Sequence, residues 1–192
     1  MSVAIVKYNA GNVCSVINAL HRLGIEPVVT DDASQLRQAD HVIFPGQGEA
    51  SSAMAYLREH GLDNVIRQLT QPVLGICVGQ QLLCTHSEEG NVDCLGIFRT
   101  DVRRFQPQPG FKVPAMGWNN IDPSPHGGFC LPGNVYFVHS YYCTLCEDTA
   151  AVAHYTRPFS AALHRDNFYA TQFHPEKSGP VGEAILRNFL NL

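Results

Sequence analysis

The first ninety residues alternate short apolar runs with stretches in which apolar residues recur every three to four positions. Strands are predicted at the apolar runs 3–7, 25–30, 41–44 and 72–76. Helices are predicted at 13–23, after Asp31 or Asp32, at 51–69 and at 78–85. Because strands and helices alternate, this half favours a mainly parallel sheet with helices on both faces.

The pattern changes after about residue 90, where glycine and proline become frequent and β-type runs dominate. Strands are predicted at 135–142, 150–155, 161–164 and 168–173, in an antiparallel arrangement. A last helix is expected at 179–191, where Val181, Ile185, Phe189 and Leu190 need to be buried. Since no repeat or linker interrupts the chain, a single α/β domain over residues 1–192 is predicted.

Composition and charge remove several classes of protein. Hydrophobic residues make up 45% of the 192 positions and charged residues 16%, which argues against a disordered chain. No apolar run approaches the roughly 18 residues of a membrane span, and the start lacks a signal peptide, so a cytoplasmic protein without membrane contact is expected. The net charge of −4, with no basic cluster beyond Arg103-Arg104, argues against nucleic-acid binding.

The strongest chemical signal is Gly75-Ile76-Cys77-Val78-Gly79, where a predicted strand turns directly into a helix. Glycines two residues before and after the cysteine allow the tight turn of a nucleophile elbow. The start of the new helix favours the thiolate of Cys77, and the N–H of Val78 faces an oxyanion position. A buried structural cysteine at a strand end is the alternative.

A thiolate nucleophile needs a base, and His174 is the best candidate among nine histidines. It follows the predicted strand 168–173 and is separated from Glu176 by a rigid proline, so the carboxylate can orient the imidazole. Both would lie at the carboxyl end of a sheet strand, where the sites of α/β proteins are found.

A third segment, Pro45-Gly46-Gln47-Gly48, also ends a predicted strand. Its glycines let peptide N–H groups turn toward an oxyanion, although a plain tight turn would explain the loop if it stood alone.

The sequence contains no complete motif for a metal site or a dinucleotide-binding site. Cys143 and Cys146 have zinc-knuckle spacing but no second Cys/His pair at a matching distance, and the seven cysteines are interpreted as free thiols. Gly46-x-Gly48 lacks the third glycine of a dinucleotide fingerprint. Neither a metal nor an organic cofactor is expected.

Taken in this order and spacing, the three segments resemble the class I (triad) glutamine amidotransferases over essentially the whole chain. Flanking segments narrow the resemblance to the glutaminase subunits of imidazole glycerol phosphate synthases. These segments are 8–15, 114–119, 136–141 and 174–179. The resemblance implies a flavodoxin-like α/β sandwich with a mainly parallel central sheet, helices on both faces and a smaller antiparallel β section in the C-terminal half.

The resemblance also implies a role for each matching residue. Cys77 would attack L-glutamine, with His174 as acid and base and Glu176 as its orienting partner. Backbone N–H groups of Val78 and of Gln47 or Gly48 would form the oxyanion hole. Glutamine would be held by Gln81, Gly48, Ser140 and Tyr141, while Asn12, Trp118, Tyr136 and Lys177 would contact a partner.

That partner would be a (β/α)₈-barrel cyclase subunit, which forms a heterodimer with the glutaminase and consumes its ammonia. Three alternatives stay open: the glutaminase of another biosynthetic synthase, a free-standing γ-glutamyl hydrolase, and an inactive scaffold subunit.

Overall fold

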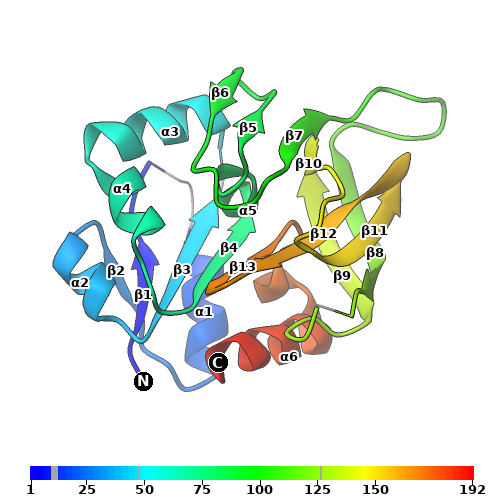
Figure 1. Cartoon of the computed structure of the whole chain (residues 1–192). Coiled ribbons are helices and arrows are strands. Elements are labelled where there is room, and N and C mark those ends of the chain that lie inside the picture. The colour runs from blue at the N-terminus through cyan, green and yellow to red at the C-terminus, as the bar shows by residue number, and fades with distance from the viewer. Residues whose placement is uncertain (10–12, 47, 126) are drawn as a thin grey trace.

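The computed structural model of the chain describes residues 1–9, 13–46, 48–125 and 127–192. Its main feature is a nine-stranded sheet in the order β2-β1-β3-β4-β13-β12-β11-β8-β9, beside a four-stranded sheet in the order β10-β7-β5-β6 (Figure 1). No helix among the described residues is long and apolar enough to cross a membrane.

The first five strands of the large sheet run parallel to one another. They are β2 (Val28–Thr30), β1 (Val3–Val6), β3 (His41–Gly46), β4 (Val73–Cys77) and β13 (Phe168–Thr171). Every residue of β1, β3 and β4 is buried, as expected for strands covered on both faces. The parallel half predicted from the sequence is therefore confirmed, although β2 is shorter than expected.

Helices pack on both faces of these strands, as the alternating pattern predicted (Figure 1). They are α1 (Cys14–Arg22), α2 (Ala33–Gln38), α3 (Ala50–Glu59), α4 (Leu62–Arg67), α5 (Val78–Leu82) and α6 (Gly179–Leu190), with the 3₁₀ turn η1 (Pro175–Lys177). Helices α3 and α4 contact each other on one side, and α1 and α6 both contact η1. Asp32 caps α2 by accepting a hydrogen bond from the Gln35 N–H at 2.9 Å.

Four antiparallel strands extend the large sheet beyond β13. They are β12 (Arg157–Arg165), β11 (Thr149–Tyr155), β8 (Ala115–Pro123) and β9 (Gly133–His139). The small sheet consists of β5 (His86–Ser87), β6 (Val92–Asp93), β7 (Asp101–Arg104) and β10 (Tyr141–Cys143). Strand β13 joins the two halves because it is parallel to β4 and antiparallel to β12.

The structure corrects several sequence-based predictions. The helix expected over 51–69 is two helices, separated where Gly61 adopts a left-handed conformation with φ +67°. The helix expected over 78–85 ends at Leu82. The strand at 168–173 is not purely antiparallel, since it pairs in parallel with β4. Strand β8, nine residues long, and the short strands β5, β6 and β7 were not predicted.

Candidate active site

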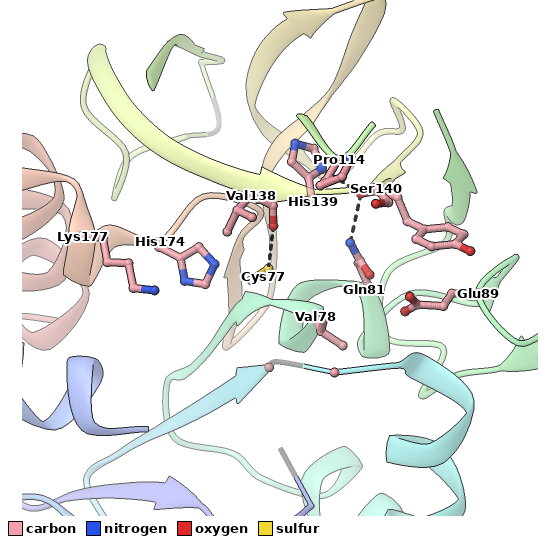
Figure 2. Close-up of a pocket in the computed structure, with 13 residues that line it drawn as sticks. Cys77, Val78, Gln81, Glu89, Pro114, Val138, His139, Ser140, His174 and Lys177 are labelled. Atoms are coloured by element: carbon pink, nitrogen blue, oxygen red, sulfur yellow. Dashed lines mark hydrogen bonds between the residues drawn. The ribbon is translucent and has the colours of Figure 1, made fainter. Parts of the chain in front are cut away.

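A pocket of about 400 Å³ opens at the carboxyl ends of β3 and β4, beneath the segment that joins β9 to β10 (Figure 2). Its wall is formed by residues from six separate parts of the chain. The lining residues are Gly46, Gly48, Cys77, Val78, Gln81, Glu89, Pro114, Val138, His139, Ser140, Tyr141, His174 and Lys177. The carboxyl ends of parallel strands are where α/β proteins bind ligands, so this pocket is the candidate active site.

Cys77 is the residue at which β4 turns into α5. Its φ of 56° and ψ of −111° are strained for a residue with a side chain, which is typical of a nucleophile elbow. The side chain is 6% exposed, and its Sγ lies 3.9 Å from the Val138 carbonyl oxygen. The predicted elbow is therefore present, with the thiol at the pocket wall.

The glycines around the elbow allow β3 and α5 to approach closely. A Cβ on Gly79 would overlap the Phe44 carbonyl oxygen, and one on Gly46 would overlap the Gly79 nitrogen. The hydroxyl of Tyr8 donates a hydrogen bond to the Pro45 carbonyl at 2.5 Å, while burial raises the pKa of this phenol. The end of β3 is thus held against the start of α5, beside Cys77.

His174 lies across the pocket from β3 and forms a buried pair with Glu176. Its Nδ1 lies 2.8 Å from Glu176 Oε1, and the side chains are only 4% and 1% exposed. Because Oε1 accepts from Nδ1–H, the other ring nitrogen is left for the nucleophile and the substrate. The predicted relation of the two residues across Pro175 is therefore observed.

The protonation of His174 is governed by its neighbours. Burial lowers its pKa, but hydrogen bonding to Cys77 and to Glu176 outweighs burial and raises the pKa to about 10. The site therefore favours the imidazolium form of His174, beside the Cys77 sulfur and the Glu176 carboxyl group. Such an arrangement holds both a nucleophile and a proton donor ready for acyl transfer.

The backbone of η1 and β9 fixes the position of His174. Its N–H donates to the Tyr136 carbonyl at 2.9 Å, and its own carbonyl accepts from Ser178 Oγ at 2.6 Å. Ser178 Oγ in turn accepts a hydrogen bond from the Tyr136 N–H at 2.9 Å. Strand β9 is consequently bonded to the segment that carries His174.

Gln81 lies on α5 one turn beyond Cys77 and is almost fully buried. Its Nε2 donates to the Tyr141 carbonyl at 3.1 Å and to Gln172 Oε1 at 3.0 Å. Figure 2 shows the side chain rising from the helix toward the segment that carries Ser140. Gly48, Ser140 and Tyr141, the other predicted substrate contacts, also line the pocket.

The predicted partner contacts are more dispersed. Trp118 is 57% exposed on β8 and faces Tyr136 across the strand pair, with ring centroids 6.0 Å apart. Lys177 lies on the pocket wall beside His174 (Figure 2). Asn12, and Gln47 of the predicted oxyanion hole, lie outside the described residues.

Three pocket or near-pocket residues were missed by sequence analysis: Glu89, His139 and Gln172. Glu89 Oε2 accepts from the Ala50 N–H at 3.0 Å, and burial raises the pKa of its carboxyl group. No local motif marks Glu89, because it reaches the pocket from a turn between β5 and β6. The sequence contained one usable signal: Gln172 directly precedes the Phe173-His174 pair at the end of a buried strand.

The described residues contain no group of three or more His, Cys, Asp or Glu side chains able to hold a metal ion. The pocket brings the side chains of Cys77 and His174 together with the backbone at the ends of β3 and β4, and Glu176 is hydrogen-bonded to His174. This combination suits nucleophilic attack on a carboxamide or other acyl carbon.

Comparison with known proteins agrees with this geometry. The family described as Glutamine amidotransferase class-I matches residues 5–192. The chain is 61% identical over its full length to an imidazole glycerol phosphate synthase subunit HisH from Bacteroides fragilis, and the match covers all of that protein as well. A protein of the same name from Idiomarina loihiensis is 44% identical, with 100% of this chain and 98% of that protein covered.

Solved structures show the same fold at lower sequence identity. A putative GMP synthase component from Thermoplasma acidophilum superposes with a TM-score of 0.75 at 23% identity, covering 100% of this chain and 93% of that one. A structure described as a glutamine amidotransferase gives a TM-score of 0.77 at 20% identity, with 100% and 98% covered.

Proposed function

The chain belongs to the class-I glutamine amidotransferase family, and we propose that it is the glutaminase subunit of imidazole glycerol phosphate synthase, in histidine biosynthesis. One observation carries the proposal: Cys77, His174, Glu176 and Gln81 meet at one pocket in a chain that matches subunits of that synthase from end to end. In this function the chain hydrolyses L-glutamine to glutamate and ammonia.

The first half of the reaction forms a thioester. The Cys77 thiolate attacks the side-chain amide carbon of glutamine, and the carbonyl oxygen becomes an oxyanion held by the N–H of Val78 and by an N–H of the 46–48 loop. His174 then gives its proton to the amide nitrogen, the C–N bond breaks, and ammonia leaves. Glu176, 2.8 Å from His174, stabilises the imidazolium throughout.

The second half restores the enzyme. Neutral His174 takes a proton from water, and the resulting hydroxide attacks the thioester carbon. The carbon–sulfur bond breaks, glutamate is released, and Cys77 and His174 return to their starting charges. No cofactor or metal ion enters either half of this reaction.

The pocket wall also offers groups for the α-substituents of glutamine. Gly48, Ser140 and Tyr141 supply backbone groups and Gln81 supplies an amide. We assign Glu89 to the α-ammonium group of glutamine, since it is a partly buried carboxylate on the pocket wall. A bound cation would offset the burial that raises the pKa of this carboxyl group.

As one component of a synthase, the chain has a partner subunit, which we propose to be a (β/α)₈-barrel cyclase in a cytoplasmic heterodimer. The cyclase uses the ammonia and a phosphoribosyl-formimino aminoimidazole carboxamide ribonucleotide to make imidazole glycerol phosphate and AICAR. Asn12, Trp118, Tyr136 and Lys177 are proposed to contact it. The exposed Trp118 beside half-buried Tyr136 supports this assignment, because aromatic anchors are common in interfaces.

The deciding experiment measures glutamate release by the chain alone, and then with the cyclase subunit and its nucleotide ligand. Strong stimulation that disappears in Cys77→Ala supports the proposal. High activity of the lone chain would instead indicate a free-standing hydrolase, and no activity under either condition would indicate a scaffold subunit. Replacing the cyclase with the acceptor subunit of another synthase tests the remaining alternative.

A further inference from the structure

Gln172 lies directly behind the catalytic pocket and contacts two of its functional side chains. It follows the last residue of β13, and its side chain is fully buried. Its Oε1 accepts a hydrogen bond from Gln81 Nε2 at 3.0 Å, and its Nε2 lies 3.8 Å from Cys77 Sγ. One amide group therefore bridges the nucleophile and a proposed substrate-binding residue.

The direction of this bridge is fixed at the Gln81 end. The Tyr141 carbonyl can only accept hydrogen bonds, and it receives one from His139 Nδ1 at 2.7 Å and one from Gln81 Nε2 at 3.1 Å. The second N–H of Gln81 is directed at Gln172 Oε1. Both donors of Gln81 are thus engaged behind the pocket, and its carbonyl oxygen is the group left to face a ligand.

The direction is also fixed at the Cys77 end. Because Gln172 Oε1 accepts the hydrogen bond from Gln81, the Nε2 of Gln172 is the atom that faces Sγ, and it can donate to the thiolate that the proposed reaction uses. If the Gln172 amide were reversed, its oxygen would face the thiolate and its nitrogen would face the nitrogen of Gln81. The acceptor at Tyr141 and the acceptor at Cys77 therefore require the same orientation of both glutamines.

We propose that Gln172 is a positioning residue for the glutaminase reaction. It donates a hydrogen bond to the Cys77 thiolate and, through the same amide, holds the Gln81 oxygen toward the pocket. There this oxygen accepts a hydrogen bond from a donor on the substrate, such as the α-ammonium group of glutamine. The substrate half of this inference rests on the proposed function, whereas the thiolate half concerns the free enzyme alone.

Site-specific alkylation tests the thiolate half without any substrate. The full chain is treated with iodoacetamide over a range of pH, and mass spectrometry follows the Cys77 peptide separately from the six other cysteines. The variant is Gln172→Met, which keeps the length of the side chain and removes both polar contacts. The matched control is Gln80→Met, because Gln80 is equally buried and adjacent to Gln81 but donates to the Ser160 carbonyl instead.

In Gln172→Met, we expect the pH midpoint of Cys77 alkylation to rise by about half a unit to one unit, since the thiolate loses a donor. In Gln80→Met the midpoint should equal that of the wild type. The buried thiols of Cys84 and Cys143 report folding in the same samples, because they stay unlabelled only while the core is intact. If Gln172→Met exposes them, Gln172→Asn, which keeps a shortened amide, should still raise the midpoint in a folded chain.

Steady-state kinetics of the chain in complex with its partner subunit test the substrate half of the proposal, in which Gln172 holds the Gln81 oxygen toward glutamine. Gln172→Met should lower kcat about tenfold and also raise KM for glutamine several-fold, because both the nucleophile and Gln81 lose a fixed partner. An unchanged midpoint in a folded Gln172 variant would overturn the proposal, as would a KM equal to that of the wild type. The two proposals can also fail separately. If Gln172→Met shifts the pH midpoint of Cys77 alkylation but the wild-type protein releases no glutamate, the contact between Gln172 and Cys77 stands and only the proposed glutaminase function is refuted.

Discussion

Glu176 has one oxygen bonded to His174 and a second, Oε2, that is buried and finds no hydrogen-bond partner among the described residues. A buried carboxylate with so few donors is costly unless a cation faces it, so its charge depends on the imidazolium. Glu176→Gln keeps an acceptor for His174 Nδ1–H and removes the charge. We expect kcat to fall about 100-fold, with little change in KM.

The pH–rate profile of Glu176→Gln shows whether Glu176 acts through its negative charge or only by holding the His174 ring in position. Glu176 is one of the two groups that raise the pKa of His174 to about 10, so its loss lowers that pKa. The imidazolium that we propose as the proton donor to the leaving group is then lost at lower pH, so the alkaline limb of the kcat profile should move to lower pH. An alkaline limb that stayed in place would mean that Glu176 only holds the ring in position.

His139 gives the stability of the protein a predictable pH dependence. Burial, with a smaller contribution from the nearby His174, lowers its pKa to about 4, although the hydrogen bond to Tyr141 opposes the shift. Below about pH 6.5 the unfolded chain binds a proton at this position that the folded chain refuses. The free energy of unfolding should therefore drop as pH falls, by about 2 kcal/mol from this residue between pH 7 and pH 5.

Urea unfolding at the two pH values measures this drop. His139→Asn retains an N–H donor near the Tyr141 carbonyl and does not titrate, so its own drop should be about 2 kcal/mol smaller than that of the wild type. Equal drops in the two proteins would show that His139 is protonated in the folded state at pH 5.

At the scale of single residues, the candidate site residues were predictable where a glycine or a proline lies close to the reactive side chain. Cys77 lies between two glycines at a strand–helix junction, and a proline separates His174 from Glu176, so these positions were predictable. Glu89 and His139 have no such marker, and Gln172 has only its position directly before Phe173 and His174. Their roles depend on which strands become neighbours, and residue spacing does not reveal that.

At the scale of elements, the site depends on the close approach of β3 and α5. A methyl group on Gly79 would overlap the Phe44 carbonyl oxygen, which is backbone and cannot move aside alone. Gly79→Ala should therefore lower the free energy of unfolding by about 3 kcal/mol and displace Cys77. Urea unfolding and Cys77 alkylation measure the two effects.

Gly128→Ala is the matched control for this substitution. Its Cβ would meet nothing within 4 Å, and its backbone does not require a positive φ. The free energy of unfolding should change by no more than about 0.5 kcal/mol. If Gly79→Ala were equally mild, the elbow would have more room than its backbone distances indicate.

Elements were predictable where apolar periodicity matched burial. Strands β1, β3 and β4 are buried throughout and were identified as apolar runs. Strand β8 was missed because only Ala115 and Ile121 of its nine residues are buried, while Met116 and Trp118 are exposed. Sequence-based prediction expects the apolar residues of a strand to be buried, and in β8 two of them are exposed. Exposed apolar residues on a strand are also typical of a surface that binds a partner.

Across the whole molecule, the candidate active site and the proposed partner surface share strand β9. Residue Tyr136 of β9 pairs with Trp118 on β8 and accepts a hydrogen bond from the backbone N–H of His174. The order of strands that creates this link could not be predicted, because β13, β12 and β11 separate β4 from β8 in the sheet although β8 precedes them in the chain. A partner that contacts Trp118 is therefore connected to His174 through a single strand pair.

This connection leads to a prediction for the assembled enzyme. Trp118→Ala removes an exposed side chain, so the free energy of unfolding of the lone chain should change by no more than about 0.5 kcal/mol. Binding of the partner subunit, measured by calorimetry, should weaken by about 2 kcal/mol, and stimulation of glutamate release should fall at a fixed partner concentration. Val28→Ala is the control, because Val28 is 53% exposed on β2 at the opposite edge of the sheet. If the two variants bound the partner equally well, the partner surface would lie away from β8 and β9.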